Sequence, residues 1–251
     1  MCGCTFSRMN ETTKDQQGLT RRASLAKLGG FAASVMGAGA LGARELWHIE
    51  DADAASAGLA AVDAGLVACV LTPEMTEGPY YVEGDKLRRN ITEGRPGVPL
   101  TLRLKVLNVS TCKPIKGAAV DIWHCDAGGV YSGTSVQNTE DERFLRGIQK
   151  TDRNGLALFK TIYPGWYGGR TVHIHLKVYL GGRTVHTGQL FFPDALTDTV
   201  YNRSPYDQRP SRDVRNASDS IFRNGGRRSL LRLARSGTGY VGRITMGVST
   251  S

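Results

Sequence analysis

The chain has 251 residues, of which 40% are hydrophobic, enough for one large folded core or two small ones. Its 32 Lys and Arg residues outnumber 23 Asp and Glu residues, and the formal net charge is +9. The densest basic stretches (21–22, 88–89 and 223–235) contain no interleaved aromatic residues, so they indicate a solvated basic surface and exclude the pattern of a nucleic-acid groove. The 31 glycines among short alternating apolar runs favour an all-β fold rich in turns.

The first 43 residues have the layout of an N-terminal tail followed by an export signal. Residues 1–17 are polar, Arg21 and Arg22 follow, and 28–43 form a short apolar run that ends in small residues. The paired arginines resemble a twin-arginine signal, although Ser24 stands where a large apolar residue is usual. The apolar run is too short and too rich in Gly and Ala for a transmembrane helix, so we predict no stable membrane span. We expect export to the periplasm or beyond the cell; an amphipathic N-terminal helix is the alternative.

The remaining sequence is interpreted as a linker or loose helix over 44–66 and one folded domain over 67–251. Residues 72–81 are loop-like, because Pro and Gly punctuate them. Alternating patterns and turn signals predict strands at 100–109, 118–124, 156–162, 171–178, 184–192 and 240–248, with a helix around 229–233. Short strands separated by Gly- and Pro-rich turns indicate a β-sandwich with irregular loops and little helix.

The five cysteines do not form a metal-binding pattern. Cys2 and Cys4 precede the predicted signal, no C-x-x-C is present, and Cys69, Cys112 and Cys125 remain. One disulfide is compatible with an oxidising compartment. Since Cys112 and Cys125 are expected at opposite ends of the strand near 118–124, that pairing is the least favoured of the three.

The strand predicted over 171–178 carries two histidines on one face. Apolar and polar residues alternate there, as in a half-buried strand, so His173 and His175 project from the same side with Cα atoms roughly 6.5–7 Å apart. Two imidazoles at that spacing can reach one cation from adjacent positions. A lone His-x-His is more often part of an ordinary solvated strand face, and the residues nearby distinguish the two interpretations.

Two tyrosines accompany this histidine pair in the sequence. Tyr131 lies in the Gly-rich loop 126–133, and Tyr167 lies in the loop that leads to Arg170 and the histidine strand. Tyrosine has an ordinary pKa of about 10 and needs a strongly Lewis-acidic cation to bind as phenolate at neutral pH. Phenolate is a hard donor that favours a trivalent metal, so Fe(III) is the expected occupant. Zinc prefers Cys or carboxylate ligands beside histidine, and Fe(II) facial triads require a carboxylate that is absent between 153 and 194.

These motifs resemble the intradiol ring-cleavage dioxygenases, and in particular their exported branch. The resemblance is carried by 71–81 (LTPEMTEGPYY), 121–133 (DIWHCDAGGVYSG), 151–155 (TDRNG), 163–167 (YPGWY) and 170–175 (RTVHIH), and it spans about 65 to 195. It departs from the family at Thr171-Val172, where Pro-Ala is usual, which should alter entry into the strand without affecting metal ligation. The resemblance implies that 67–251 is a catalytic domain with one Fe(III) per chain.

The resemblance also implies a role for each site residue. Tyr131 and His173 would be equatorial ligands, and Tyr167 and His175 axial ligands, with a hydroxide completing the site. A catechol-type diol would bind as a chelate and lose protons to the hydroxide and to Tyr167, which leaves the metal. Reaction with O₂ would then give a muconate-type diacid, and Arg170 would stabilise negative charge on the ring.

Further residues are assigned to the substrate pocket by the same resemblance. Gly78, Pro79 and Tyr80 are expected to line it, and Gln189 on the following strand is expected either to face it or to serve in hairpin hydrogen bonding. His124 is expected to pack or cap and not to bind iron. The sequence leaves open which diol is the substrate, and whether the chain forms a homo-oligomer. The alternatives are a non-catalytic transthyretin-like β-sandwich module and, less favoured for lack of carboxylates, a divalent-metal hydrolase.

Overall fold

The structure is a computed structural model that describes residues 70–250. The predicted N-terminal tail and export signal (1–43), the predicted linker or loose helix (44–66) and Cys69 lie outside the described residues. The strands are β1 (Pro99–Asn108), β2 (Ala119–Trp123), β3 (Arg146–Lys150), β4 (Leu156–Ile162), β5 (His173–Leu180), β6 (Arg183–Phe191), β7 (Arg232–Ser236) and β8 (Gly239–Val248). The helices are α2 (Asp194–Tyr201) and α3 (Ser220–Arg223), with short 3₁₀ turns at Ser135–Gln137, Tyr206–Gln208, Asn216–Ser218 and Gly226–Ser229.

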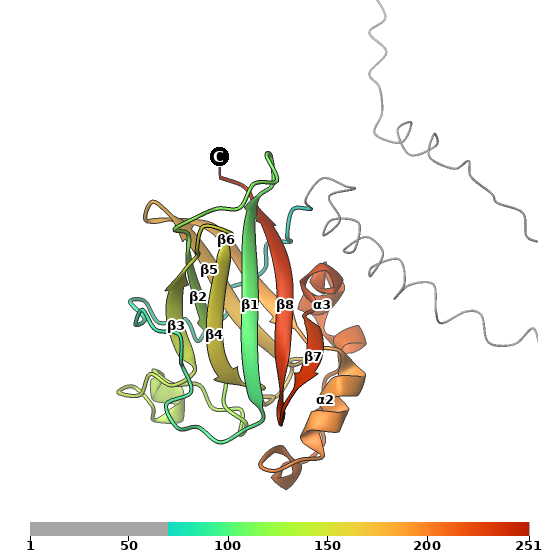
Figure 1. Cartoon of the computed structure of the whole chain (residues 1–251). Coiled ribbons are helices and arrows are strands. Elements are labelled where there is room, and N and C mark those ends of the chain that lie inside the picture. Colours follow the sequence, from blue (N-terminus) through green and yellow to red (C-terminus); the bar gives the residue numbers. More distant parts are fainter. Residues whose placement is uncertain (1–69, 251) are drawn as a thin grey trace, which may run out of the picture. The chain divides into compact units, whose positions relative to one another are not determined.

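The eight strands form two four-stranded sheets, so the all-β sandwich predicted from the sequence is confirmed. The first sheet has the order β4-β1-β8-β7 and the second has the order β3-β2-β5-β6 (Figure 1). All neighbouring pairs are antiparallel except β1 and β8, which run parallel. The two helices and most of the 3₁₀ turns follow β6, so they lie outside the segment that builds the histidine strand and its neighbours.

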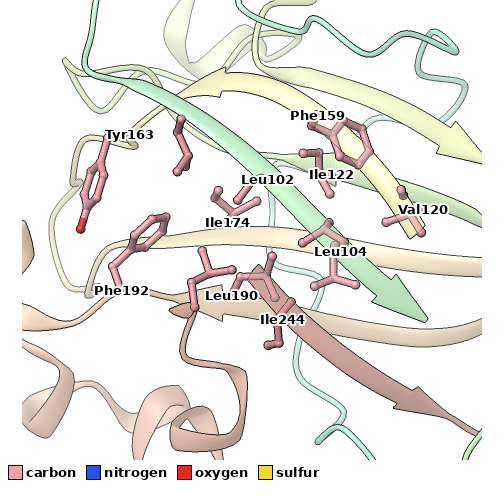
Figure 2. Packing of buried hydrophobic residues seen from close by; sticks show 14 of the residues in the cluster. Leu102, Leu104, Val120, Ile122, Phe159, Tyr163, Ile174, Leu190, Phe192 and Ile244 are labelled. Carbon is pink, nitrogen blue, oxygen red and sulfur yellow. The ribbon is translucent and has the colours of Figure 1, made fainter. Parts of the chain in front are cut away.

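The core lies between the two sheets and is built from the inward residues of the alternating strands. Leu102 and Leu104 of β1 and Ile244 of β8 face Ile122 of β2 and Ile174 of β5 across this space (Figure 2). All five are at most 7% exposed. Burying a Leu or Ile side chain stabilises the fold by about 1.5–3 kcal/mol, so this layer fixes which residues of each strand point away from it.

Most of the strands predicted from the sequence are confirmed, but β3 and the start of β7 were not predicted as strands. The predicted 100–109, 118–124, 156–162, 184–192 and 240–248 correspond to β1, β2, β4, β6 and β8 within one or two residues. The helix expected around 229–233 is wrong, because a 3₁₀ turn ends at Ser229 and Arg232 begins β7, which pairs with β8. Strand β3 was not predicted from the sequence. Both strands are short, five residues each, and their pairing partners decide their conformation more than local propensity does.

The histidine strand is buried on both faces, which corrects the expectation of a half-buried strand. On one side Ile174 contributes to the core, and on the other His173 and His175 are 3% and 0% exposed. The segment that precedes β1 covers this second side. Its Met75 amide donates a hydrogen bond to the Thr187 carbonyl of β6, and its Arg88 amide donates to the Ile148 carbonyl of β3. His173 and His175 are therefore enclosed between β5 and the segment that precedes β1.

The cysteines follow the prediction where the structure describes them. Cys112 is disulfide-bonded, and Cys125 is a buried free thiol, so these two are not paired with each other. Between residues 70 and 250, the structure contains no helix long and apolar enough to cross a bilayer.

Candidate metal and diol site

The two histidines of β5 direct their Nε2 atoms to one point. His173 Nδ1 lies 2.6 Å from the Thr171 carbonyl oxygen, which can only accept, so Nδ1 carries the proton and Nε2 presents its lone pair. The Nε2 atom of His175 lies 3.0 Å from that of His173, with the two rings nearly perpendicular at 77°. The strand geometry thus places two imidazole donors around one position, as the period of two predicts.

Tyr167 and Tyr131 complete a ring of four donors around this position. Tyr167 Oη lies 3.1 Å from His173 Nε2, and the rings of Tyr131 and Tyr167 meet edge to face at 5.6 Å. Tyr131 is fully buried and its Oη makes no hydrogen bond within the described residues. An orphaned buried hydroxyl is costly unless a further group satisfies it.

The loops that carry the two tyrosines are fixed to each other by hydrogen bonds and close packing. Asp126 Oδ1 accepts from the amides of Gly128 and Val130 at 2.9 Å each and shapes the first loop. The Gly165 amide donates to the Asp126 carbonyl at 3.0 Å. A Cβ at Gly165 would lie 2.4 Å from that same oxygen, so only glycine lets the two loops approach this closely. The separation of the two phenols is therefore set by backbone contacts.

Burial sets the protonation of the four donors. It lowers the pKa of His173 to about 3 and that of His175 well below its ordinary value, with the Arg170 charge acting in the same direction. Both imidazoles are thus neutral at pH 7, as metal ligands must be. Burial also raises the pKa of Tyr167 to about 12 and that of Tyr131 well above 10. The phenols ionise only if a strong Lewis acid takes the place of their protons.

This donor set can hold a metal ion of a particular kind. In the described part of the chain, no three His, Cys, Asp or Glu side chains come together in a metal-binding group. Cys125 donates to the Gly165 carbonyl at 3.5 Å, and burial raises its pKa to about 12, so it stays a thiol. Two neutral imidazoles and two phenols remain, which suits a hard, highly charged cation better than zinc.

Arg170 lies at the edge of this site and is held by two partners. As predicted, it precedes β5 and follows the Gly168-Gly169 turn. Its Nε donates to Asp219 Oδ2 at 2.8 Å, and its Nη2 donates to Gln189 Oε1 at 2.6 Å. Gln189 in turn donates to the Thr76 carbonyl at 2.9 Å. The guanidinium is therefore aimed by a carboxylate on one side and an amide on the other.

The sequence departure at Thr171 takes part in the same arrangement. Its backbone N–H donates to Asp219 Oδ2 at 2.9 Å, and its hydroxyl donates to Asn216 Oδ1 at 2.8 Å. A proline at this position would lack the N–H. Thr171 therefore changes how the chain enters β5, as expected. It does so through Asp219, which also accepts a hydrogen bond from Arg170.

The segment 78–80 lies against the site at two of its three residues. Gly78 has φ +75°, and a Cβ there would lie 2.9 Å from His175 Cε1. Tyr80 stacks on Tyr131 with ring centroids 4.3 Å apart. Pro79 is exposed and has no described contact with the four donors. This segment therefore forms part of the wall over the metal position.

Two residues that support the site were not found from the sequence. The Trp123 ring stacks on His175 at 5.0 Å with an interplanar angle of 6° and fixes the imidazole plane. Asp219 caps α3, its Oδ1 accepting from the amides of Ile221 and Phe222 at 2.8 and 2.9 Å, while its other oxygen binds Arg170. The sequence could have predicted the helix cap, because Asp219 precedes a short apolar run. It could not have predicted the contact with Arg170, which lies 49 residues away in the chain.

The other histidines do not join the donor set. His124 is fully buried, with Nδ1 2.8 Å from the Cys125 carbonyl and Nε2 2.7 Å from Thr161 Oγ1, in agreement with a packing role. His186 bonds Glu74 at 2.8 Å, a partner that the sequence did not suggest. His48 lies outside the described residues.

The fold is a β-sandwich whose candidate site combines two histidines with two tyrosines. A family model described as Dioxygenase matches residues 76–201. A solved intradiol ring-cleavage dioxygenase from Tetranychus urticae is 38% identical, with a TM-score of 0.68 over 72% of this chain and 95% of that one. A dioxygenase domain from Streptomyces sp. SirexAA-E is 32% identical, with a TM-score of 0.57 over 72% of this chain and all of that one.

A curated relative agrees with these structural neighbours. Catechol 1,2-dioxygenase 1 of Acinetobacter lwoffii is 31% identical over 102 residues, 39% of this chain and 32% of that protein. The chain spans about a third to a half of the curated relatives it matches. The chain belongs to the intradiol ring-cleavage dioxygenase family.

Proposed function

We propose that the protein is a non-haem Fe(III) dioxygenase that cleaves the ring of a catechol-type ortho-diol between its two hydroxyl-bearing carbons. The products of diol and O₂ would be muconate-type diacids, with one iron per chain. The observation that carries this proposal is the convergence of Tyr131, Tyr167, His173 and His175 on one buried position. A non-catalytic β-sandwich module has no use for two phenols that face a histidine pair.

The residues present fit Fe(III) because of what each phenol needs. Tyr131 Oη is buried and unpartnered, and burial holds its pKa well above 10, so only a strongly Lewis-acidic cation would both satisfy and ionise it. The neutral Nε2 atoms of His173 and His175 supply the two remaining donors. When bound, Fe(III) would withdraw electron density from the diol and bring O₂ chemistry to its ring.

Tyr167 is the donor best placed to move a proton. It is half-buried, whereas Tyr131 is fully buried, so Tyr167 lies on the side from which a diol can arrive. As a phenolate it would take the proton of one substrate hydroxyl at Oη. Burial raises the pKa of Tyr167 to about 12, so the phenolate oxygen binds that proton strongly. This step turns a neutral diol into the more reactive anion.

Arg170 would stabilise negative charge as it develops on the substrate. Its side chain is 17% exposed, and its guanidinium is pre-positioned by Asp219 and Gln189, so no reorganisation is needed when charge appears. Tyr80 and Gly78 would form one wall of the pocket and exclude water from the reacting ring.

Export is proposed as the second part of this function. The Arg21-Arg22 signal motivates it, and the disulfide at Cys112 supports it because such bonds are rare in reducing compartments. A twin-arginine route carries folded proteins, which suits a metal inserted before transport.

The test combines metal analysis with product identification. We expect about one iron per chain and a visible tyrosinate-to-Fe(III) band in the purified protein. Oxygen uptake should be measured with catechol, hydroxyquinol, protocatechuate and chlorinated catechols, and the product identified by NMR. Tyr131→Phe should weaken both iron retention and colour. Tyr163→Phe, at a buried tyrosine that bonds Thr197 in the core, is the matched control and should keep both. Stoichiometric zinc without a visible band would refute the proposal.

A further inference from the structure

The outer face of the first sheet, opposite the core, carries cations and no acids. Strands β1, β4, β7 and β8 contain no Asp or Glu residue. The side chains of β1 alternate, so Leu102 and Leu104 enter the core while Arg103 and Lys105 point outward. The basic face consists of five exposed residues: Lys160 of β4, Arg103 and Lys105 of β1, Arg243 of β8 and Arg232 of β7.

The strand register arranges three of these cations in one row, and a fourth lies diagonally beyond the end of that row. Arg103 lies directly opposite Arg243, which lies directly opposite Arg232. Lys160 is opposite Thr101, two residues along β1 from Arg103. Since neighbouring strands are about 4.8 Å apart, the three aligned cations span roughly 10 Å across β1, β8 and β7, and Lys160 extends the group onto β4.

This arrangement works against the stability of the isolated domain. Like charges directly opposite each other on neighbouring strands are destabilising. Among residues 70–250, Arg103, Lys105, Lys160 and Arg243 form no ion pair. A face of mixed sign would give the same solubility with less repulsion, so solubility alone does not explain a row of one sign.

In the described part of the chain, the portion of the basic face formed by β4, β1 and β8 is uncovered, and it is separate from the metal site. In Figure 1 no described element crosses in front of β4, β1 and β8. The donor histidines lie on the second sheet, on the side turned away from the shared core, as the burial of Ile174 between them shows. A partner bound to the basic face would therefore leave the diol site accessible.

We propose that the basic face binds a linear acidic polysaccharide, one that carries a carboxylate or sulfate on successive sugars. A linear polyanion can follow cations that succeed one another across neighbouring strands, and charge complementarity relieves the repulsion between Arg103 and Arg243. The outward positions of the four strands otherwise hold Thr, Leu, Ile, Val, Ala, Ser, Pro and Gly and no aromatic residue, so the bases of a single-stranded nucleic acid have nothing to stack on. Leu156, Leu158 and Val241 are half-buried and do not protrude as lipid-inserting side chains do.

The test uses the full iron-loaded protein with polygalacturonate as the probe and neutral dextran as its uncharged counterpart. The variant is Arg103→Glu with Arg243→Glu. The matched control is Lys113→Glu with Lys116→Glu, at two exposed lysines of the β1–β2 connection, which changes the net charge by the same amount. We expect polygalacturonate binding that weakens at least about tenfold in the face variant and less than about twofold in the control, because only the former breaks the row. Turnover of a free diol should be unchanged in both.

Three outcomes would overturn the proposal. Equal weakening in the two variants would mean that only net charge matters. Equal or tighter binding of anionic vesicles or duplex DNA by the wild type would show that the face does not select a polysaccharide. Polygalacturonate binding that persists at about 0.3 M salt would show that exposed charges are not what holds the polysaccharide, because salt screens such charges. If the glutamate variant fails to fold, the same comparison can be made without charge reversal. The face variant is then Arg103→Gln with Arg243→Gln, and the control is Lys113→Gln with Lys116→Gln.

Discussion

Asp219 holds Arg170 with one carboxylate oxygen and caps helix α3 with the other. Oδ2 accepts from Arg170 Nε at 2.8 Å, and Oδ1 accepts from the amides of Ile221 and Phe222. Burial alone would raise the pKa of Asp219, but hydrogen bonds from Phe222, Thr171 and Arg170 outweigh it and lower the pKa. A residue distant in sequence thus keeps an anion beside the guanidinium that we propose stabilises charge on the substrate.

Asp219→Asn should separate these two roles. The asparagine carbonyl can still cap α3, but its NH₂ would face the Arg170 Nε and the Thr171 N–H, donor against donor. We expect kcat to fall by about 10- to 100-fold with iron content unchanged, because small misplacements of a catalytic group have effects of this size. Asp219→Ala should lose the cap as well, at about 1 kcal/mol of unfolding free energy. If Asp219→Asn turns over diol at the wild-type rate, Asp219 does not position Arg170.

Arg170→Ala should give a coloured but slow protein. The guanidinium contacts Asp219 and Gln189 and none of the four donors, so iron and the charge-transfer band should remain. Loss of one preorganised charge-stabilising donor costs about 3–4 kcal/mol at the transition state, which is roughly 10²-fold or more in kcat. Steady-state kinetics with parallel iron analysis measure this. Loss of iron would instead assign Arg170 to holding the Tyr167 loop, and full activity would remove it from the mechanism.

Gly78→Ala should weaken metal binding through His175. The added methyl would lie 2.9 Å from His175 Cε1, so the ring must move out of its stack on Trp123. An added cost of about 1.4 kcal/mol in the bound state corresponds to tenfold weaker iron retention, measured by chelator competition. Gly84→Ala is the control, because its φ of +82° gives the same backbone strain with nothing within 4 Å. Equal loss in both variants would mean that backbone strain, and not contact with His175, is responsible.

His124 should make the fold sensitive to acid. Burial lowers its pKa to about 4 from an ordinary 6.5, so between these values the unfolded chain binds a proton that the folded chain does not. The free energy of unfolding is therefore unaffected by the protonation of His124 above pH 6.5. It decreases as the pH falls toward 4, by up to about 1.4 kcal/mol per pH unit. His124→Gln should reduce this slope in denaturant titrations, whereas Thr161→Val keeps the histidine and should retain it. An unchanged slope in His124→Gln would show that another group is responsible.

The paired arginines should direct the folded protein out of the cytoplasm. Arg21→Lys combined with Arg22→Lys should leave the protein inside, because the twin-arginine pathway reads that pair. Cell fractionation with activity as the readout measures this, and a single Arg8→Lys change, in the polar stretch before the pair, serves as control. Normal export of the double variant would contradict a twin-arginine route.

The sequence by itself determined six of the eight described strands, and it singled out the four side chains that we propose as metal donors. Strand alternation is local, so β1, β4 and β8 and the shared face of His173 and His175 could be predicted from a window of ten residues. The placement of Arg170 before the strand also followed locally, from the Gly168-Gly169 turn.

Tertiary structure decided what surrounds those donors, because the contacts join residues that no local pattern relates. The stacking of Trp123 on His175 depends on the pairing of β2 with β5, and the anion beside Arg170 comes from the segment before α3. The burial of both histidines depends on the segment that precedes β1 folding over the second sheet. Strand β7 likewise forms because β8 offers it a partner, although the sequence around 229–233 suggested a helix that would include its first two residues. Pairing and burial are energies shared between distant segments, so they appear only once the chain has folded.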